Sequence, residues 1–497
     1  MSLINVIDLT FGYEGSYVDV FENVSFQIDT DWKLGFCGRN GCGKTTFLNL
    51  LMDKYEYTGT ISKMVDFEYF PFSVSDPSLD VLAVIESIAV GVPLWQIRKE
   101  LFMLAVSEDV LYRPFSTLSE GEKTKVLLAS LFLKENRYLL IDEPTNHLDS
   151  VTREIVASYL NSKKGFILVS HDRYFLDECC DHTLYINKTN IEVVNGNFSV
   201  FWEHKQRQDA FEIAQNVKLS KEIDRLKIAS KRTARWADKA ESAKIGFDPK
   251  KVEKSKNRRP YEGAKSKKMM QASKSIQLRQ QTNIDEKSKL LRNIETADTL
   301  KIHELEYFSS NLVILEKLSV IYDNRRIFKP ISFSFEQSDR IAILGVNGSG
   351  KSSILKLICG MDIPYEGQLF VGNRLKISFV PQDASFLEGS LADFIKDNEI
   401  DETLFKTILI KMNFTKEQFD TDISDYSAGQ KKKVLLACSL SQTAHLYIWD
   451  EPLNYIDILS RIQIEELILS HSPPLIFVEH DKTFCENIAT KSILLER

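Results

Sequence analysis

Cysteine is scarce in this sequence, and the cysteines that occur do not have the spacing of a metal site. The 497 residues include 7 cysteines without a C-x-x-C pair, which argues against a zinc site, an iron–sulfur cluster and a disulfide framework. Scattered, unpaired thiols fit a reducing compartment. The cysteines are Cys37, Cys42, Cys179, Cys180, Cys359, Cys438 and Cys485.

Long apolar runs are missing as well. The most apolar stretch, residues 81–95, is interrupted by Glu86 and Pro93 and is shorter than the roughly 20 residues that span a bilayer. The N-terminal MSLINVIDLTFGY contains no basic segment followed by an apolar core, so we expect no signal peptide. We therefore expect a cytoplasmic protein without a transmembrane segment, folded into two or three domains at roughly 150 residues per domain.

What the sequence does contain is a long internal repeat. The segments LGFCGRNGCGKTTFLNLL (34–51) and IAILGVNGSGKSSILKLI (341–358) each predict a buried strand, a glycine-rich loop and an amphipathic helix. Both match G-x-x-x-x-G-K-[ST], in which backbone N–H groups, a helix N-terminus and the lysine bind phosphate oxygens. The expected nucleotide-binding residues are Gly38, Asn40, Gly41, Gly43, Lys44, Thr45 and Thr46, and Gly345, Asn347, Gly348, Gly350, Lys351, Ser352 and Ser353.

Each loop is followed by strand patterns that end in chemically active side chains. RYLLIDEP (137–144) and HLYIWDEP (445–452) end in Asp-Glu, where the aspartate and the loop hydroxyl hold Mg²⁺ and the glutamate orients and deprotonates a water. GFILVSHD and PLIFVEHD end near a histidine that would reach the γ-phosphate. The expected metal-binding residues are Thr45, Asp142, Ser352 and Asp450, and the expected catalytic residues are Glu143, Glu451, His171 and His480.

The spacing of these motifs indicates two copies of one arrangement. Lys44 lies 77 residues before the glycine of LSEGEK, and Lys351 lies 78 residues before the glycine of YSAGQK. From that glycine to the metal-binding aspartate the interval is 21 residues in both copies, and from aspartate to histidine it is 29 and 30. Coincidence does not produce this register, so the repeat is structural.

The ordered motifs resemble the ATP-binding cassette superfamily, present twice. The resemblance implies two α/β P-loop domains that bind ATP and Mg²⁺ and hydrolyse ATP. It also implies head-to-tail packing, so that each ATP lies between the phosphate loop of one cassette and the signature of the other. A tyrosine before each loop matches the aromatic that stacks on adenine, a contact worth about 1 to 3 kcal/mol, although a half-buried strand residue is the alternative. The signature residues expected to contact ATP are Ser119, Gly121, Ser427 and Gly429, and the expected adenine-stacking residues are Tyr13 and Tyr322.

The two cassettes depart from the superfamily pattern in different ways. Glu120 and Ala428 stand where the first signature glycine is usual. In FVPQD, Gln382 matches the glutamine that contacts the metal, whereas the first cassette has Phe72 in YFPFS. The first cassette has EPTNHLD where the second has EPLNYID, which is a further asymmetry. The two sites are therefore expected to differ in how they contact Mg²⁺ and can hydrolyse ATP at different rates.

Positive charge is concentrated between the two repeats. Residues 205–292 contain 25 Lys plus Arg and 11 Asp plus Glu, a net charge of +14, in a chain whose total is −7. The remaining residues therefore carry −21. This segregation indicates that the segment between the cassettes meets a polyanion. A solvated linker whose charges only maintain solubility is the alternative.

The same segment predicts an antiparallel helical hairpin. An outgoing helix over 205–243 would be about 55 to 60 Å long, and Gly246 and Pro249 would end it. Aromatic residues at its far end suit stacking on unpaired bases, or could pack between the helices. The apolar stripes are Leu219, Ile223 and Leu226, and Ile276, Ile284, Leu291 and Ile294; the expected RNA-contacting residues are Trp236, Lys244, Phe247, Lys250, Lys251, Lys254, Lys256, Arg258, Arg259, Lys265, Lys267 and Lys268.

Two cassettes on one chain, EPTNHLD and a basic helical linker together resemble the ABC-F class of ribosome-associated ATPases, over essentially the whole chain. EPLNYID, YIWDEP and the short first cassette are most similar to the Lsa-type antibiotic-resistance subgroup. That resemblance implies a protein that binds the E site of the bacterial 70S ribosome. Its linker tip would reach 23S rRNA near the peptidyl-transferase centre and the P-site tRNA, and would displace lincosamides, streptogramin A compounds and pleuromutilins.

The expected domains are residues 1–200 for the first cassette, 201–300 for the hairpin with its tip near 244–264, and 301–497 for the second cassette. We expect a monomer in which the two cassettes pair within one chain. Three alternatives stay open: a housekeeping translation factor of the same class, the tandem ATPase subunit of a membrane importer, and a DNA-repair ATPase. The 77-residue spacing leaves no room for the long coiled coil of the last, so we expect no DNA partner.

Overall fold

The computed structural model describes residues 2–15, 19–134, 136–146, 148–186, 191–245, 267, 275, 279, 305–412 and 414–496. The chain divides into two compact units, one formed by Met1–Phe201 with Asp298–Arg497 and the other by Trp202–Ala297. The larger unit therefore contains both segments in which a cassette is expected. The domain limits at residues 200 and 300 stay a prediction.

Each cassette contains one mainly parallel sheet, and the order of the five strands in the second sheet matches the first five of the six strands in the first sheet. The central strands β7 and β17 are wholly apolar and buried, as expected for a sheet covered on both faces. Among the described strands of these two sheets, only β8 and β9, at one edge of the first sheet, pair antiparallel. In order, the first sheet is β5 (Asp66–Phe70), β6 (Arg137–Asp142), β7 (Phe166–Val169), β3 (Lys33–Gly38), β8 (His182–Ile186) and β9 (Ile191–Asn195); the second is β15 (Ile377–Val380), β16 (Leu446–Asp450), β17 (Leu475–Val478), β13 (Arg340–Leu344) and β18 (Lys491–Leu494).

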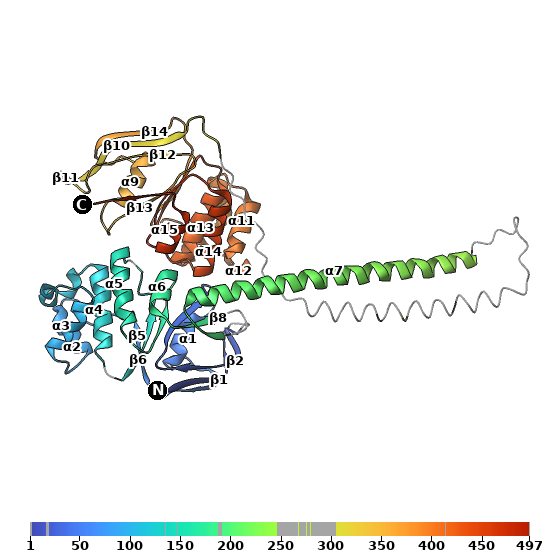
Figure 1. The fold of residues 1–497 in the computed structure, drawn as a ribbon, viewed down its shortest axis with the longest axis horizontal. Coiled ribbons are helices and arrows are strands. Elements are labelled where there is room, and N and C mark those ends of the chain that lie inside the picture. The colour runs from blue at the N-terminus through green and yellow to red at the C-terminus, as the bar shows by residue number, and fades with distance from the viewer. Residues whose placement is uncertain are drawn as a thin grey trace, which may run out of the picture. The chain divides into compact units, whose positions relative to one another are not determined.

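A smaller antiparallel sheet belongs to each cassette (Figure 1). Tyr13 follows the central strand of the first of these sheets, and Tyr322 ends the central strand of the second. Each sheet thus carries the predicted adenine-stacking tyrosine toward the phosphate loop. The strands are β2 (Phe21–Asp29), β1 (Leu3–Phe11) and β4 (Thr58–Ser62) in the first cassette, and β11 (Arg325–Arg326), β10 (Asn311–Tyr322), β12 (Ile331–Glu336) and β14 (Tyr365–Val371) in the second.

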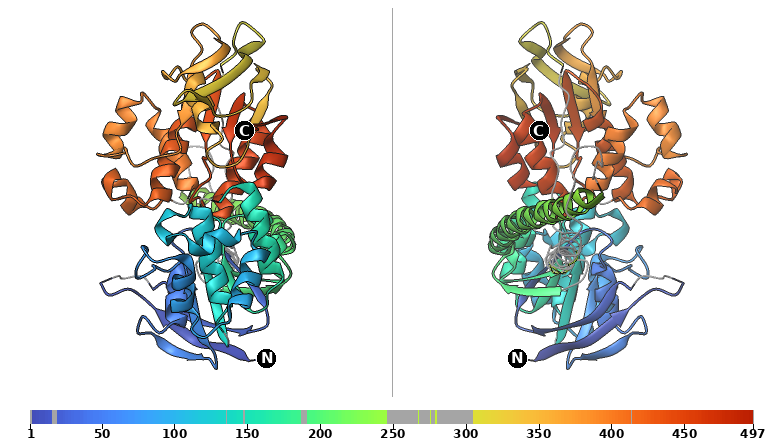
Figure 2. Two further views of the ribbon diagram at one scale, coloured as in Figure 1. Left: turned by 90° about the vertical axis from the view of Figure 1, so that its left-hand side faces the viewer. Right: turned by 90° about the vertical axis from the view of Figure 1, so that its right-hand side faces the viewer.

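Helices cover the parallel sheets and divide each core into two layers. In the second cassette Trp449 and Tyr447 face a core built with the helices of residues 391–441, while Ile448 faces the core beneath the antiparallel sheet. Figure 2 shows the orange helices grouped apart from the olive antiparallel strands. Trp449 is only 1% exposed, and full burial of one such side chain contributes about 1.5 to 3 kcal/mol. The helices are α1 (Lys44–Leu51), α2 (Val81–Ile88), α3 (Leu94–Met103), α4 (Glu120–Phe132), α5 (Ser150–Asn161), α6 (Arg173–Cys179), α9 (Lys351–Ile358), α10 (Leu391–Asp397), α11 (Glu402–Lys411), α12 (Lys416–Phe419), α13 (Ala428–Ser441), α14 (Ile458–His471) and α15 (Lys482–Ile488).

Helix α7 (Phe198–Ile245) leads into the segment between the cassettes and is 48 residues long, or about 70 Å at 1.5 Å per residue. It contains the predicted outgoing helix. Ile223 is buried and Leu219 is half-buried, in agreement with the predicted stripe. The return helix and its apolar stripe lie outside the described residues. Among the helices that the structure describes, none combines the length and apolar character needed to cross a membrane.

Candidate nucleotide-binding sites

Both glycine-rich loops curl around the lysine that begins the following helix. Lys44 Nζ donates to the carbonyl oxygens of Gly38 at 2.8 Å and Arg39 at 3.0 Å. In the second loop Lys351 Nζ donates to Gly345 at 2.8 Å and to the next carbonyl at 3.1 Å. The ammonium groups are thus held inside the loops, where phosphate oxygens would be received.

The glycine before each lysine is required by the backbone. Gly43 has φ +99° and Gly350 has φ +88°, a left-handed conformation that side chains rarely tolerate. A Cβ at Gly43 would also lie 2.6 Å from Val20 and 2.9 Å from Phe21. Any other residue would therefore displace the loop from the start of α1. Burial lowers the pKa of Lys351, and the negative charges of Glu451, Asp149 and Asp450 partly offset that decrease.

The two aspartates that are predicted to bind Mg²⁺ have different partners in the two cassettes. Asp142 accepts hydrogen bonds from Thr45 Oγ1 at 3.0 Å and from the Tyr69 hydroxyl at 2.9 Å. Asp450 is fully buried, and neither of its carboxylate oxygens has a hydrogen-bond partner among the described residues. Burial raises the pKa of both aspartates, and the Ser352 hydroxyl opposes that rise at Asp450. Buried carboxylate oxygens without partners are unfavourable, so Asp450 beside Ser352 fits a divalent cation.

A magnesium ion bound here would complete its coordination largely with phosphate oxygens and water. That explains why, within the described parts of the chain, no group of three or more His, Cys, Asp or Glu residues could hold a metal ion. One buried carboxylate beside one hydroxyl is the protein contribution expected at a site where Mg²⁺ binds together with a nucleotide.

Tyr69 is a contact that sequence reasoning missed. In the first sheet Phe70 lies opposite Ile141, and in the second Val380 lies opposite Trp449. This register makes Tyr69 the counterpart of Phe379, just as Phe72 is the counterpart of Gln382. An alignment of YFPFS with FVPQD on their shared proline is the signal that could have identified it. The first cassette thus has a phenol on its aspartate and lacks the glutamine amide.

Glu143 lies in a poorly solvated position at the first site. Its Oε1 atom is buried without a hydrogen bond and lies 3.2 Å from His171 Nε2. Burial and the neighbouring Asp142 raise the pKa of Glu143 to about 8. Burial, with the charges of Lys44 and Arg461, lowers the pKa of His171 well below its usual value. Both groups are therefore largely neutral at pH 7.

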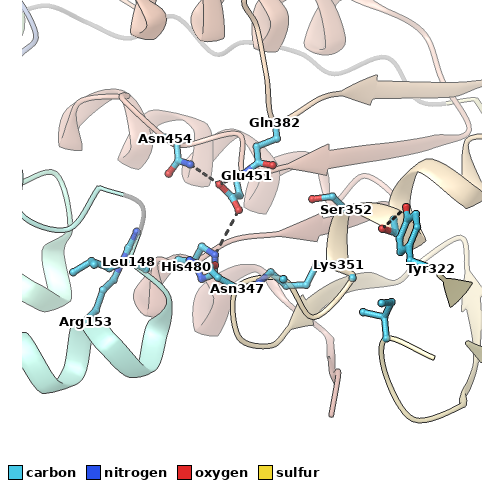
Figure 3. Close-up of a pocket in the computed structure, with 14 residues that line it drawn as sticks. Leu148, Arg153, Tyr322, Asn347, Lys351, Ser352, Gln382, Glu451, Asn454 and His480 are labelled. Atoms are coloured by element: carbon cyan, nitrogen blue, oxygen red, sulfur yellow. Dashed lines mark hydrogen bonds and ion pairs between the residues drawn. The ribbon is translucent and has the colours of Figure 1, made fainter. Parts of the chain in front are cut away.

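Glu451 has a different environment at the second site (Figure 3). Its Oε2 atom accepts from Gln382 Nε2 at 2.9 Å and from Asn454 Nδ2 at 2.6 Å, and His480 Nε2 lies 3.5 Å from Oε1. Burial acts to raise the pKa of Glu451, but the contact with His480 and the hydrogen bond from Gln382 outweigh it and lower the pKa to about 2. The carboxylate is therefore ionised and oriented. The backbone φ of Glu451 is +47° and that of Glu143 is +51°, so both glutamates are held in the strained left-handed region.

A cavity of about 450 Å³ at the second site joins residues of both cassettes. Leu148 and Arg153 of the first cassette enter it from one side in Figure 3. Ser119 and Gly121 are not among its lining residues, although a Cβ at Gly121 would lie 3.6 Å from Leu148. The residues contributed by the second cassette are Tyr322, Ile327, Asn347, Gly348, Gly350, Lys351, Ser352, Ser353, Gln382, Glu451, Asn454 and His480.

Matching contacts join the loops to the opposite cassette. The Asn347 N–H donates to Asp149 Oδ2 at 3.4 Å, and Asn40 Nδ2 donates to the carbonyl of Tyr455 at 2.9 Å. A Cβ at Gly429 would lie 2.7 Å from the same Tyr455 carbonyl. The second signature is therefore adjacent to the first phosphate loop. These contacts are the head-to-tail arrangement that the cassette resemblance implies.

The signature serines begin helices in the same way. The Ser119 hydroxyl accepts from the Glu122 N–H at 3.3 Å, and the Ser119 N–H donates to the Glu122 carboxylate at 2.9 Å. Ser427 and Gln430 form the same reciprocal capping box at α13. Such caps stabilise a helix start by about 0.5 to 2 kcal/mol, so both signatures are rigidly presented.

The two tyrosines lie beside the loops with half-exposed rings. The Tyr13 hydroxyl shares a 2.6 Å hydrogen bond with Thr46 Oγ1, and the Tyr322 hydroxyl shares one of 3.2 Å with Ser353 Oγ. Each side chain is 46% exposed, which leaves room for a base to stack.

The expected RNA-contacting residues fall largely outside the described part of the chain. Lys267 is described, and it is helical and exposed. Trp236 and Lys244 belong to α7, but the positions of their side chains lie outside the description. The other nine positions lie wholly outside it: Phe247, Lys250, Lys251, Lys254, Lys256, Arg258, Arg259, Lys265 and Lys268.

Comparison with known proteins identifies the repeated unit. A protein-family model described as ABC transporter matches residues 21–146 and 328–454. The ribosome protection protein VmlR of Bacillus subtilis is 26% identical over 505 residues, which cover 99% of this chain and 86% of that protein. The ATP-binding protein Uup of Buchnera aphidicola is 25% identical over 520 residues, covering 100% and 81%.

ABC transporter F family member 2 of Arabidopsis thaliana is 24% identical over 548 residues, covering 99% of this chain and 76% of that one. Among solved structures, the RNase-L inhibitor matches with a TM-score of 0.64 at 17% identity, covering 99% and 88% of the two chains. At that identity the structural likeness shows the fold alone.

Proposed function

The chain belongs to the ABC transporter family, and from that premise we propose that it is a ribosome-associated ATPase of the ABC-F class rather than part of a transporter. Within that class we assign it to the Lsa-type antibiotic-resistance subgroup. It acts in the cytoplasm, binds the E site of the bacterial 70S ribosome, and uses its linker to displace lincosamides, streptogramin A compounds and pleuromutilins from the peptidyl-transferase centre.

The observation that carries this proposal is the basic segment between two acidic cassettes. A net charge of +14 over residues 205–292 gives the linker the electrostatic character of a nucleic-acid-binding element. The similarity to VmlR supports the same conclusion, because it extends over 99% of this chain and therefore includes the linker.

ATP binding and hydrolysis follow from the two sites. When bound, Mg²⁺ would neutralise phosphate charge next to Asp142 and Asp450. Lys44 and Lys351 bind the phosphates, and the head-to-tail contacts close the cassettes around the nucleotide. Because ATP binds the closed arrangement better, it shifts the protein toward that state.

Hydrolysis allows the two cassettes to separate again. Glu451, ionised and held by Gln382 and Asn454, accepts the proton of the attacking water at the second site. Glu143 performs the same role at the first site once its proton has been lost. ATP binding thus favours attachment to the ribosome and hydrolysis favours release.

A housekeeping translation factor of the same class is the second candidate. The ATP-binding protein Uup is similar over the whole of this chain at 25% identity, close to the 26% of VmlR. Identity at this level does not separate the two functions, since both need the same ATPase. The two differ in what the linker tip does. A membrane importer subunit would have no use for the basic segment.

Drug susceptibility distinguishes the candidates. The chain is expressed in a susceptible bacterium, and the minimum inhibitory concentrations of one compound from each of the three drug classes are measured. We expect higher values with the wild type and none of that rise with Lys44→Ala combined with Lys351→Ala, produced at matched levels. Unchanged susceptibility to all three classes, with ribosome binding intact, would reject the resistance function and leave the housekeeping one.

A further inference from the structure

Lys432 is a buried lysine in the signature helix of the second cassette. It lies on α13, five residues after Ser427, and is 2% exposed. Its Nζ donates to three backbone carbonyls, those of Pro381 at 2.8 Å, Gln382 at 3.0 Å and Asp450 at 3.2 Å. An ammonium group has three N–H donors, so these bonds satisfy it completely.

The three carbonyls and the helix belong to different ATP sites. Gln382 and Asp450 form part of the second site. Near the start of α13, a Cβ at Gly429 would lie 2.7 Å from the Tyr455 carbonyl, which accepts from Asn40 of the first phosphate loop. Ser427 caps the same helix. A single side chain therefore joins the signature that serves the first site to the chain segments that hold the metal and the catalytic carboxylate of the second.

Glu479 extends this connection on the other side of Glu451. It is 4% exposed, and its carboxylate accepts from the Leu453 N–H at 2.7 Å and from the His480 N–H at 3.0 Å. Leu453 precedes Asn454, which donates to Glu451. Burial lowers the pKa of Lys432 to about 8, and Glu479 is the acidic group that most opposes this decrease. Burial raises the pKa of Glu479, and Arg461 is the charge that most opposes this rise.

The first cassette has neither charge. In the alignment of the two repeats, Thr124 is the counterpart of Lys432, and Ser170 is the counterpart of Glu479. The Ser170 hydroxyl instead pairs with Thr145 Oγ1 at 3.3 Å. A threonine cannot donate to three separated carbonyls. At this position the first cassette therefore has no equivalent link between its signature helix and the loops of its own ATP site.

We propose that Lys432 and Glu479 are positioning residues that couple the first ATP site to hydrolysis at the second. Engagement of Ser427 and Gly429 by nucleotide at the first site sets the position of α13. Lys432 transmits that position to the Gln382 loop and to the end of the Asp450 strand, and so to the hydrogen bonds that orient Glu451. The inference rests on the ATPase part of the proposed function and is independent of the ribosome.

A double-mutant cycle tests the coupling on purified protein with ATP and Mg²⁺ alone. In the Glu143→Gln background only the second site hydrolyses, and Ser427→Ala weakens engagement of the first site. We expect Ser427→Ala to change the second-site kcat about three- to ten-fold more with Lys432 present than with Lys432→Met, a typical coupling within one hydrogen-bond network. An equal effect of Ser427→Ala in both contexts would overturn the proposal.

A mirror experiment is the matched control. In the Glu451→Gln background only the first site hydrolyses, Ser119→Ala perturbs the second, and Thr124→Ala replaces Lys432→Met. We expect no coupling between Ser119 and Thr124. Coupling as large as in the first cycle would show that Lys432 has no special role.

A purely structural role of Lys432 predicts a different pattern. Loss of packing alone would lower the melting temperature and kcat without removing the dependence on Ser427. Lys432→Gln, which keeps two amide donors, is expected to restore part of the coupling, and Glu479→Gln to reduce it. If Lys432→Met does not fold, these two variants decide the question. Full coupling in both would reject the proposal, whereas failure to bind ribosomes would not affect it.

Discussion

The two ATP sites should respond differently to pH, because the glutamates that we propose as catalytic bases differ in protonation. Burial and Asp142 raise the pKa of Glu143 to about 8, whereas His480 and Gln382 overcome burial to hold the pKa of Glu451 at about 2. Only the ionised form accepts a proton from water. Each site can be tested alone: Glu451→Gln leaves only the first site active, and Glu143→Gln leaves only the second.

The size of the effect follows from the fraction ionised. With a pKa of about 8, Glu143 is about 9% ionised at pH 7, about 50% at pH 8 and about 91% at pH 9. The first-site rate should therefore rise about five-fold from pH 7 to 8 and about ten-fold from pH 7 to 9. Glu451 is ionised throughout this range, so the second-site rate should not change for this reason.

Single-turnover hydrolysis of radiolabelled ATP at saturating Mg²⁺ measures both rates. The quantity to compare is the ratio of the first-site to the second-site rate at each pH, because titration of the nucleotide itself cancels in the ratio. We expect the ratio to rise about ten-fold between pH 7 and 9. A constant or falling ratio would refute the assignment of a protonated Glu143.

Three further predictions concern the amide that the first site lacks, a buried ion pair and the basic linker. Phe72→Gln should give the first site the amide donor that the second has, lower the pKa of Glu143 and speed first-site hydrolysis at pH 7; an unchanged pH–rate profile would count against it. Arg461→Met breaks the buried pair with Asp481, joined at 3.1 Å, and should lower the free energy of unfolding by about 3 to 5 kcal/mol; urea denaturation with a shift under 1 kcal/mol would contradict this. Replacing the lysines and arginines of residues 250–268 by glutamine should weaken ribosome binding and flatten its salt dependence, and undiminished retention at high salt would exclude a role for that charge.

Much of the fold and of the site was accessible from sequence because each phosphate loop is local. Its glycines, lysine and hydroxyl lie within ten residues, so spacing alone predicts their geometry. The repeat then predicted two copies of one α/β sheet, and the matching strand orders confirm this. The pairing of the loops with the opposite cassette followed only from the resemblance.

Contacts between distant segments were not accessible in this way. The hydrogen bond of Tyr69 to Asp142 depends on strand register, and the three bonds of Lys432 depend on how α13 packs against two loops. Both positions look like ordinary variation in a single sequence. The asymmetry at Phe72 and Gln382 was visible, but its effect on protonation required the buried environment of Glu143.

Cosedimentation with ribosomes tests the central claim most directly. The Glu143→Gln, Glu451→Gln protein is mixed with bacterial 70S ribosomes, with ATP or without nucleotide, and centrifuged through a sucrose cushion. We expect pelleting that depends on ATP, because the closed cassettes persist when hydrolysis is blocked. Absence of the protein from the ribosome pellet in both conditions, with ATP binding verified, would contradict it.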